Sequence, residues 1–179
     1  WRQVSLVELL ADQKYALAIG PFGSNLKRSD YRTSGVPLVF VRNIRANDFD
    51  LSPVYVTRAK ANDLSSHVVR EGDVLVTKMG DPPGDTTIYP VNRPDAVITA
   101  DCIKVTSDPE VVSNRYLSLV IDSPVGATQI RQMTGGVAQQ KVNLAKFRKF
   151  QVPLAPRREQ DQIVEILEDQ LARLDASLA

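Results

Sequence analysis

The sequence has one cysteine, Cys102, and one histidine, His67, among its 179 residues. A single cysteine excludes an intrachain disulfide framework and a cysteine-based metal cluster, and it fits a reducing cytoplasm. A single histidine excludes a histidine-rich metal site, and any Ser-His-Asp or Cys-His arrangement would depend on His67 alone. We expect His67 to be a surface residue near a helix end. The sequence therefore predicts a cytoplasmic protein with no metal site and no catalytic residue.

Long apolar runs and a strong charge of one sign are also missing. No run approaches the roughly 20 apolar residues that span a bilayer, and no signal-peptide pattern opens the chain, so we expect no membrane partner. The net charge of +1 divides unevenly, because residues 157–179 contain three arginines and six acidic residues. The preceding part is thus modestly basic, a balance that permits nucleic-acid binding without requiring it.

The length and the hydrophobic content of 43% predict one packed domain with an appendage. The chain begins at Trp1 instead of methionine, and we expect it to be a piece of a longer or processed protein.

Short apolar runs rich in β-branched residues and bounded by Gly, Pro and Asp are typical of strands. We predict strands at residues 36–41, 73–77, 96–105 and 146–154. Ser113 is suited to cap a helix through Ile121, which is interrupted near Pro124 and resumes over residues 127–133. Because the elements show no regular βαβ alternation, they predict an α+β fold with one domain around a bent, largely antiparallel sheet.

Residues 156–179 form a second predicted unit, an amphipathic helix of coiled-coil type that follows the domain at residues 1–155. Apolar residues recur there at steps of three and four, the spacing of a helix-pairing seam. The seam consists of Ile163, Val164, Leu167, Leu171, Leu174 and Leu178. Such a helix either folds back onto its own domain or pairs with a partner helix. We favour the partner, because two heptads alone are marginally stable in water.

Two segments resemble chemical motifs. Asp81-Pro82-Pro83-Gly84 is close to the Asp-Pro-Pro-aromatic motif of amino-methyltransferases, but glycine replaces the aromatic residue that would stack on a flipped base. No glycine-rich strand-to-helix turn for S-adenosylmethionine is evident, so we interpret the segment as a turn between strands. Gly20-Pro21-Phe22-Gly23 is likewise interpreted as a turn. No Gly-Lys-Ser/Thr follows a glycine run, which excludes a nucleotide-triphosphate P-loop.

Polar side chains beside glycines are suited to contacts with duplex DNA. Arg and Lys bind phosphates or guanine edges, whereas Asn and Gln bind adenine bidentately. The candidate DNA-binding residues are Ser24, Asn25, Lys27, Arg28, Arg42, Asn43, Lys78, Gln139, Gln140, Lys141 and Asn143. Each one alone is more often a solvated surface residue, and only the whole set is informative.

The order of these segments resembles one target recognition domain of a type I restriction-modification specificity subunit. The similar segments are Trp1 with Val4 and Leu6, residues 20–27, Asp30-Tyr31, residues 35–37, residues 42–44, residues 72–80, residues 98–105, residues 135–140, Asn143-Leu144 and Val152-Pro153-Leu154 leading into Glu159-Gln160 and Ile163. The resemblance covers essentially the whole chain. Ala155 departs from the pattern, because the family often has a second proline there.

The resemblance implies a non-catalytic subunit without cofactors that selects double-stranded DNA for methyltransferase (modification) subunits and a motor (restriction) subunit. The chain would read one part of a split target, and its helix would join a second recognition half. Three alternatives are a natural half-length subunit that acts as a homodimer, a scaffold that reads no sequence, and a fragment of an adenine methyltransferase. The bases recognised and the spacer length do not follow from the sequence.

Overall fold

The computed structural model describes residues 1–135 and 140–178. Its centre is a four-stranded antiparallel sheet in the order β2-β9-β6-β7, in which β6 and β9 are buried along their whole length. Its strands are β2 (Leu17–Ile19), β6 (Val74–Thr77), β7 (Thr86–Ile88) and β9 (Cys102–Val105). Continuous apolar runs such as Val74-Leu75-Val76 give β6 two buried faces.

A second four-stranded sheet has the order β4-β3-β8-β5. Its strands are β3 (Val36–Val39), β4 (Tyr55–Val56), β5 (Val68–Val69) and β8 (Ala96–Ile98). The β3–β8 pair is parallel and the other pairs are antiparallel. The predicted α+β class with largely antiparallel pairing is therefore confirmed, and the strands are distributed over two larger sheets and two short ribbons instead of one bent sheet.

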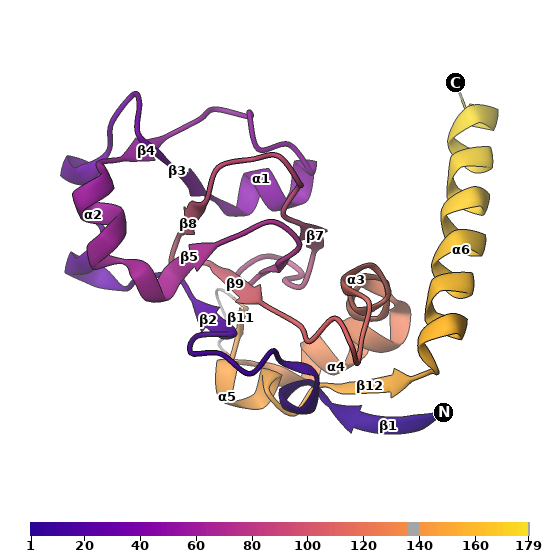
Figure 1. Cartoon of the computed structure of the whole chain (residues 1–179). Helices are drawn as coiled ribbons and strands as arrows, with labels where there is room; N and C mark the ends of the chain where they lie inside the picture. Colours follow the sequence, from indigo (N-terminus) through magenta and orange to yellow (C-terminus); the bar gives the residue numbers. More distant parts are fainter. Residues whose placement is uncertain (136–139, 179) are drawn as a thin grey trace.

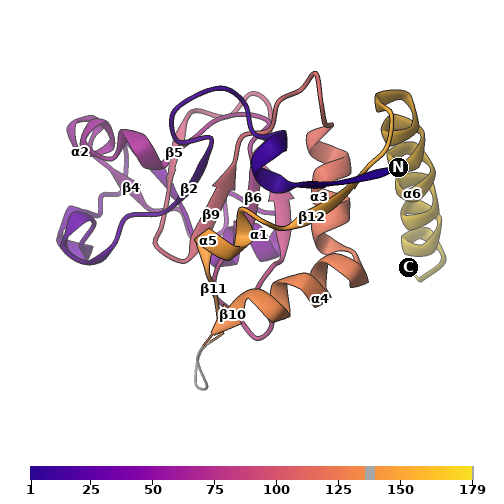
Figure 2. The ribbon, with the colours of Figure 1, turned by 90° about the horizontal axis from the view of Figure 1, so that it is seen from below.

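Two short two-stranded ribbons accompany the larger sheets. β1 (Arg2–Ser5) pairs with β12 (Gln151–Leu154), and β10 (Thr134–Gly135) pairs with β11 (Lys141–Val142), both antiparallel. Figure 2 shows β10 and β11 at the end of α4. The first strand and the last strand are thus neighbours, although almost the whole domain separates them in sequence.

Six α-helices complete the described residues: α1 (Val41–Ala46), α2 (Arg58–Asp63), α3 (Asn114–Asp122), α4 (Pro124–Met133), α5 (Leu144–Phe147) and α6 (Arg157–Leu178). The predicted cap of α3 is confirmed, because the Ser113 hydroxyl accepts a hydrogen bond from the Tyr116 amide. Pro124 occupies the first turn of α4, where a missing amide hydrogen has no effect on the helix. Leu117, Ile121 and Ile130 from these two helices are buried in the main core against β6 and β9.

Three sequence predictions of strands need correction. Residues 41–46 form α1, because the Asn43 side chain accepts the Phe40 amide and starts a helix directly after β3. Residues 96–105 form two strands, since the amide of Cys102 bonds to the carbonyl of Thr99 and turns the chain between them. The predicted strand over residues 146–154 begins only at Gln151, because Asn143 caps α5 by accepting the Lys146 amide.

His67 lies at the end of a 3-10 turn after α2 and is half-buried. Its Nδ1 is 2.7 Å from the carbonyl oxygen of Ile19, so the ring ties this turn to β2. This contact gives His67 a structural position between two elements.

The long helix α6 stands at the edge of the molecule beside α3 and projects away from the sheets (Figure 1). Only its first turns pack on the domain: Val164 is 5% exposed and belongs to the main core, and Ile163 packs against that core. The first turns of the helix therefore fold back onto their own domain. The prediction of a partner helix stays a prediction for the residues beyond them.

Candidate nucleic-acid interface

Four chain segments meet around a pocket of about 490 Å³ next to the central sheet. They are the start of α1, the β6–β7 loop, the turn between β8 and β9, and the residue that precedes β11. The lining residues are Phe40, Val41, Arg42, Arg45, Met79, Gly80, Asp81, Thr99, Asp101 and Gln140. The β10–β11 hairpin is held there because Met79 bridges Lys141 and the amide of Val142 donates to the carbonyl of Lys78 at 2.9 Å.

Two arginines from α1 form the basic side of the pocket. The guanidinium of Arg42 lies 4.0 Å from the centroid of the Phe40 ring and donates to the carbonyl of Ser52 at 2.7 Å. Arg45 forms an ion pair with Asp85 at 2.9 Å, and both side chains are 44% exposed. These contacts fix the two guanidinium planes and leave other N–H donors for a ligand.

Gly80 allows this arrangement because Arg45 crosses directly over it. A Cβ at residue 80 would lie 2.1 Å from Nη2 of Arg45 and 2.7 Å from the carbonyl oxygen of Pro82. Any larger residue would therefore displace Arg45 or the loop.

Lys78 connects the pocket to the first glycine turn. Its ammonium lies 4.5 Å from the centroid of the Phe22 ring, and the residue is only 9% exposed. Burial lowers the pKa of Lys78, the negative charge of Asp101 opposes this shift, and the nearby Lys141 adds to it. Phe22 directly precedes the 3-10 turn of Gly23, Ser24 and Asn25, so this contact links that turn to Lys78.

Two acidic residues, Asp81 and Asp101, face the same pocket. Among residues 1–135 and 140–178, no side chain or amide donates a hydrogen bond to either carboxylate, and neither forms an ion pair. Carboxylates accept hydrogen bonds only, whereas arginine and lysine only donate and glutamine does both. The pocket therefore offers donors and acceptors together, as the edges of nucleic-acid bases do.

The structure brings some of the predicted residues together. Arg42 and Gln140 line the pocket, Lys78 and Lys141 adjoin it, and Ser24 and Asn25 follow Phe22. Lys27 and Arg28 lie at the next 3-10 turn and do not line it. Gln139 lies outside the described residues.

Asn43 and Asn143 have structural contacts instead. The Asn43 side chain is 2% exposed and bonds to the Phe40 amide and to the carbonyls of Asp48 and Leu51. Asn143 caps α5. The predicted base contact of Asn43 is not kept, because both N–H donors of its buried side-chain amide bond to main-chain carbonyls. Asn143 is exposed and stays a candidate, because its cap contact uses only the side-chain oxygen.

Arg45, one of the polar residues beside Arg42 and Asn43 that the sequence indicates as suited to duplex contacts, lines the pocket. Sequence reasoning missed Phe40, Met79, Asp81 and Asp101 as members of this site. Asp101 interrupts an apolar run, and this polar break was the available signal for the turn between β8 and β9. Phe40 and Met79 are apolar and carry no distinguishing pattern.

The residues of the predicted helix-pairing seam fall into two groups along α6. Ile163 and Val164 face their own domain, so their assignment to a partner seam is corrected. Leu167, Leu171 and Leu174 are 38%, 53% and 58% exposed, and Ile166 is 57% exposed. The side chain of Leu178 lies outside the described residues. We call Ile166, Leu167, Leu171 and Leu174 the outer stripe.

The described residues contain no group of three or more His, Cys, Asp or Glu placed to hold a metal ion. Among the described helices none combines the length and the apolar character needed to cross a membrane.

Comparisons with known proteins place the chain in a family. A family model described as the type I restriction modification DNA specificity domain matches residues 26–177. No curated protein matches the chain.

Solved structures share the fold. A structure from work on complex assembly and conformational transition of the type I R-M system is 20% identical with a TM-score of 0.68, and the match covers 99% of this chain and 40% of that chain. The HsdS subunit from Thermoanaerobacter tengcongensis is 19% identical with a TM-score of 0.64, covering 100% and 40%. The type I restriction-modification S subunit from M. genitalium is 12% identical with a TM-score of 0.60, covering 98% and 40%.

The chain thus spans 40% of the length of these structures. Since the family model matches most of its residues, the chain belongs to the type I restriction-modification DNA specificity domain family.

Proposed function

We propose that this chain reads one part of a bipartite target in double-stranded DNA through the pocket and the loops around it. The observation that carries the proposal is that four separate segments place two arginines, a glutamine and two carboxylates around one opening, and that no residue among 1–135 and 140–178 pairs with these carboxylates. Base edges in the major groove present acceptors on guanine and donors on cytosine and adenine. A surface with both kinds of group discriminates between them, whereas a purely basic surface would bind all sequences alike.

The roles within the site follow from the chemistry of each side chain. We propose that Gln140 and the carboxylates contact base edges, because they include acceptors that a phosphate would repel or ignore. Lys78, Lys141 and the free donors of Arg42 are assigned to phosphates. Ser24 and Asn25 extend the contact surface beyond Phe22. Lys27, Arg28 and Gln139 stay candidates for outer contacts.

The subunit is proposed to be non-catalytic and to bind no cofactor. Methyl transfer and DNA translocation would then belong to methyltransferase subunits and a motor (restriction) subunit with which a specificity subunit assembles. Membership of the specificity domain family supports the proposal that other subunits catalyse these steps.

The outer stripe of α6 is proposed to pair with another helix. Exposed leucines at steps of four and three make a seam of coiled-coil type. The partner helix belongs either to a second recognition half or to a second copy of this chain, and sedimentation of the purified chain distinguishes the two. A stable dimer supports the homodimer, and a monomer supports a second half from elsewhere.

Binding to a randomised duplex pool at two salt concentrations tests the function. Sequencing of the retained fraction should return a short motif that persists at the higher salt concentration. Binding that is uniform across sequences and lost with salt would reduce the chain to a nonspecific electrostatic binder. Methyl transfer by the purified chain would instead support the methyltransferase alternative.

Gln140→Ala then locates the base contacts. It should cost about 1 to 3 kcal/mol on the selected motif and relax one position of it. Gln170→Ala, on the exposed surface of α6, is the matched control and should leave the motif unchanged. Equal weakening on every sequence would make Gln140 a phosphate or packing residue.

A further inference from the structure

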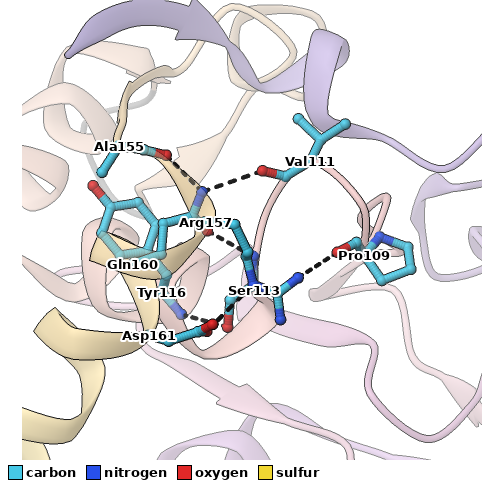
Figure 3. Close-up of polar contacts among 8 residues, drawn as sticks. All are labelled: Pro109, Val111, Ser113, Tyr116, Ala155, Arg157, Gln160 and Asp161. Atoms are coloured by element: carbon cyan, nitrogen blue, oxygen red, sulfur yellow. Dashed lines mark hydrogen bonds and ion pairs between the residues drawn. The ribbon is translucent and has the colours of Figure 1, made fainter.

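Gln160, in the first turn of α6, is 0% exposed although it carries a polar amide. Its Nε2 donates to the carbonyl of Ala155 at 2.9 Å and to the carbonyl of Val111 at 3.2 Å. Its Oε1 accepts the amide of Ser113 at 2.8 Å. Figure 3 shows the three bonds converging on this one side chain.

The three partners come from two different segments, and each is a main-chain atom. Val111 and Ser113 belong to the loop that leads into α3, and Ala155 follows β12. Main-chain atoms cannot rotate away as surface side chains do. One amide therefore ties the base of α6 to the start of α3 and to the strand from which α6 emerges.

Neighbouring contacts also hold the first turns of α6 against the domain. Arg157 donates to the carbonyl of Pro109 and pairs with Asp161. One turn further, Val164 is buried against the core, and Arg115 of α3 pairs with Glu168. These contacts end near the middle of the helix, at Glu168, and the outer stripe lies beyond or beside them.

We infer that Gln160 is a positioning residue that fixes the direction in which α6 leaves the domain. Glutamine suits this task because two N–H donors and one acceptor match two carbonyls and one amide. Glutamate would place a negative oxygen against two carbonyl oxygens. Methionine would keep the length of the side chain and remove all three bonds.

The direction matters because the helix is long. From Gln160 to Leu178 the rise of 1.5 Å per residue gives about 27 Å, so a pivot of about 10° at the base moves the far end by about 5 Å. That shift exceeds the rise of roughly 3.4 Å per base pair along the DNA helix axis. If α6 connects two recognition halves, which rests on the proposed function, the helix direction held by Gln160 contributes to the distance between the two parts of the target.

Distances between two nitroxide labels on the full chain, measured by pulsed electron paramagnetic resonance without DNA, test the inference. One label is placed at Asn62→Cys on α2 and one at Ala172→Cys on α6, both exposed positions. Cys102 is buried and does not compete for the label. Since DNA is absent, a failure of this test is distinct from a failure of DNA recognition.

Gln160→Glu and Gln160→Met are compared with Gln162→Glu, which makes the same chemical change at an exposed position two residues away. We expect one narrow distance distribution for the unmodified chain and for Gln162→Glu, and a broad or shifted distribution for both variants of Gln160. Lowering the pH from about 8 to 5 should narrow the distance distribution of Gln160→Glu, because a protonated glutamic acid regains one donor. The distance distribution of Gln160→Met should not change with pH.

Hydrogen exchange of the β6 and β9 amides, measured in parallel, reports whether the domain stays folded. Protected strands together with a broadened distance support the inference. An unchanged distribution in both variants overturns it. Loss of strand protection in both variants also overturns the inference, because Gln160 would then be needed for the folding of the whole domain and not only for the direction of α6.

Discussion

Replacing Lys78 with methionine should weaken DNA binding while leaving the stability of the domain almost unchanged. The aliphatic stem is retained, and only the ammonium above the Phe22 ring is lost. Burial lowers the pKa of Lys78, so the folded state disfavours its charge, and removal of that charge offsets the lost cation–π contact, worth about 0.5 to 2 kcal/mol. The free energy of unfolding is expected to change by about 1 kcal/mol or less.

The binding change follows from counterion release. One phosphate contact contributes about 0.9 to the slope of log K against log salt, which at about 0.15 M salt equals roughly a fivefold change in affinity, or about 1 kcal/mol. Fluorescence anisotropy titrations at several salt concentrations, on the selected motif and on a scrambled duplex, measure the slope. Urea unfolding measures stability.

Lys14→Met, at an exposed position that does not line the pocket, is the control. The assignment of Lys78 to a phosphate is refuted if Lys78→Met keeps the full salt slope, or if it weakens binding only on the selected motif.

Three further outcomes are expected. Asn43→Ala should lower the free energy of unfolding by about 2 to 4 kcal/mol in urea, because the buried Asn43 side chain loses its three bonds to main-chain groups, while the salt slope of DNA binding stays unchanged; an unaltered urea midpoint would contradict this. Leu167→Asp with Leu171→Asp should abolish helix pairing in sedimentation without changing domain unfolding, since both side chains are exposed; unfolding of the domain would show that these leucines pack on it. Burial raises the pKa of Cys102 to about 12, whereas the unfolded thiol titrates near about 8.5. The contribution of this thiol to stability is therefore complete below about pH 8.5 and is lost as the pH rises toward about 12. In urea titrations between about pH 8 and 10.5, Cys102→Ser should lose less unfolding free energy than the unmodified chain, and an identical loss would argue against this role of Cys102.

The sequence was informative where a pattern has one physical meaning. A Ser-Asn pair before an apolar run predicted the cap of α3, and the three-four spacing predicted a helix over the last part of the chain. The same spacing is equally compatible with packing on the domain, so it did not distinguish Val164 from Leu171. Only the position of α3 beside the helix base separates the buried half of the seam from the exposed half.

Site residues were predictable only by type. Asparagine caps helices and also binds adenine, so Asn43, Asn143 and Asn25 look alike in sequence. The structure separates them, because the first two bond to the main chain of their own loops. Asp101 and Phe40 join the pocket through the turn between β8 and β9 and the end of β3, which are long-range arrangements without a local signal.

The pairing of β1 with β12 bears on whether this domain can be exchanged for another domain of the same fold. The first and last strands of the domain are adjacent and antiparallel (Figure 1). A domain whose two connections lie side by side can be replaced by another of the same fold without moving the segments that flank it. Under the proposed function, the loops around the pocket can therefore vary while the strand pair that joins the two ends of the domain stays the same.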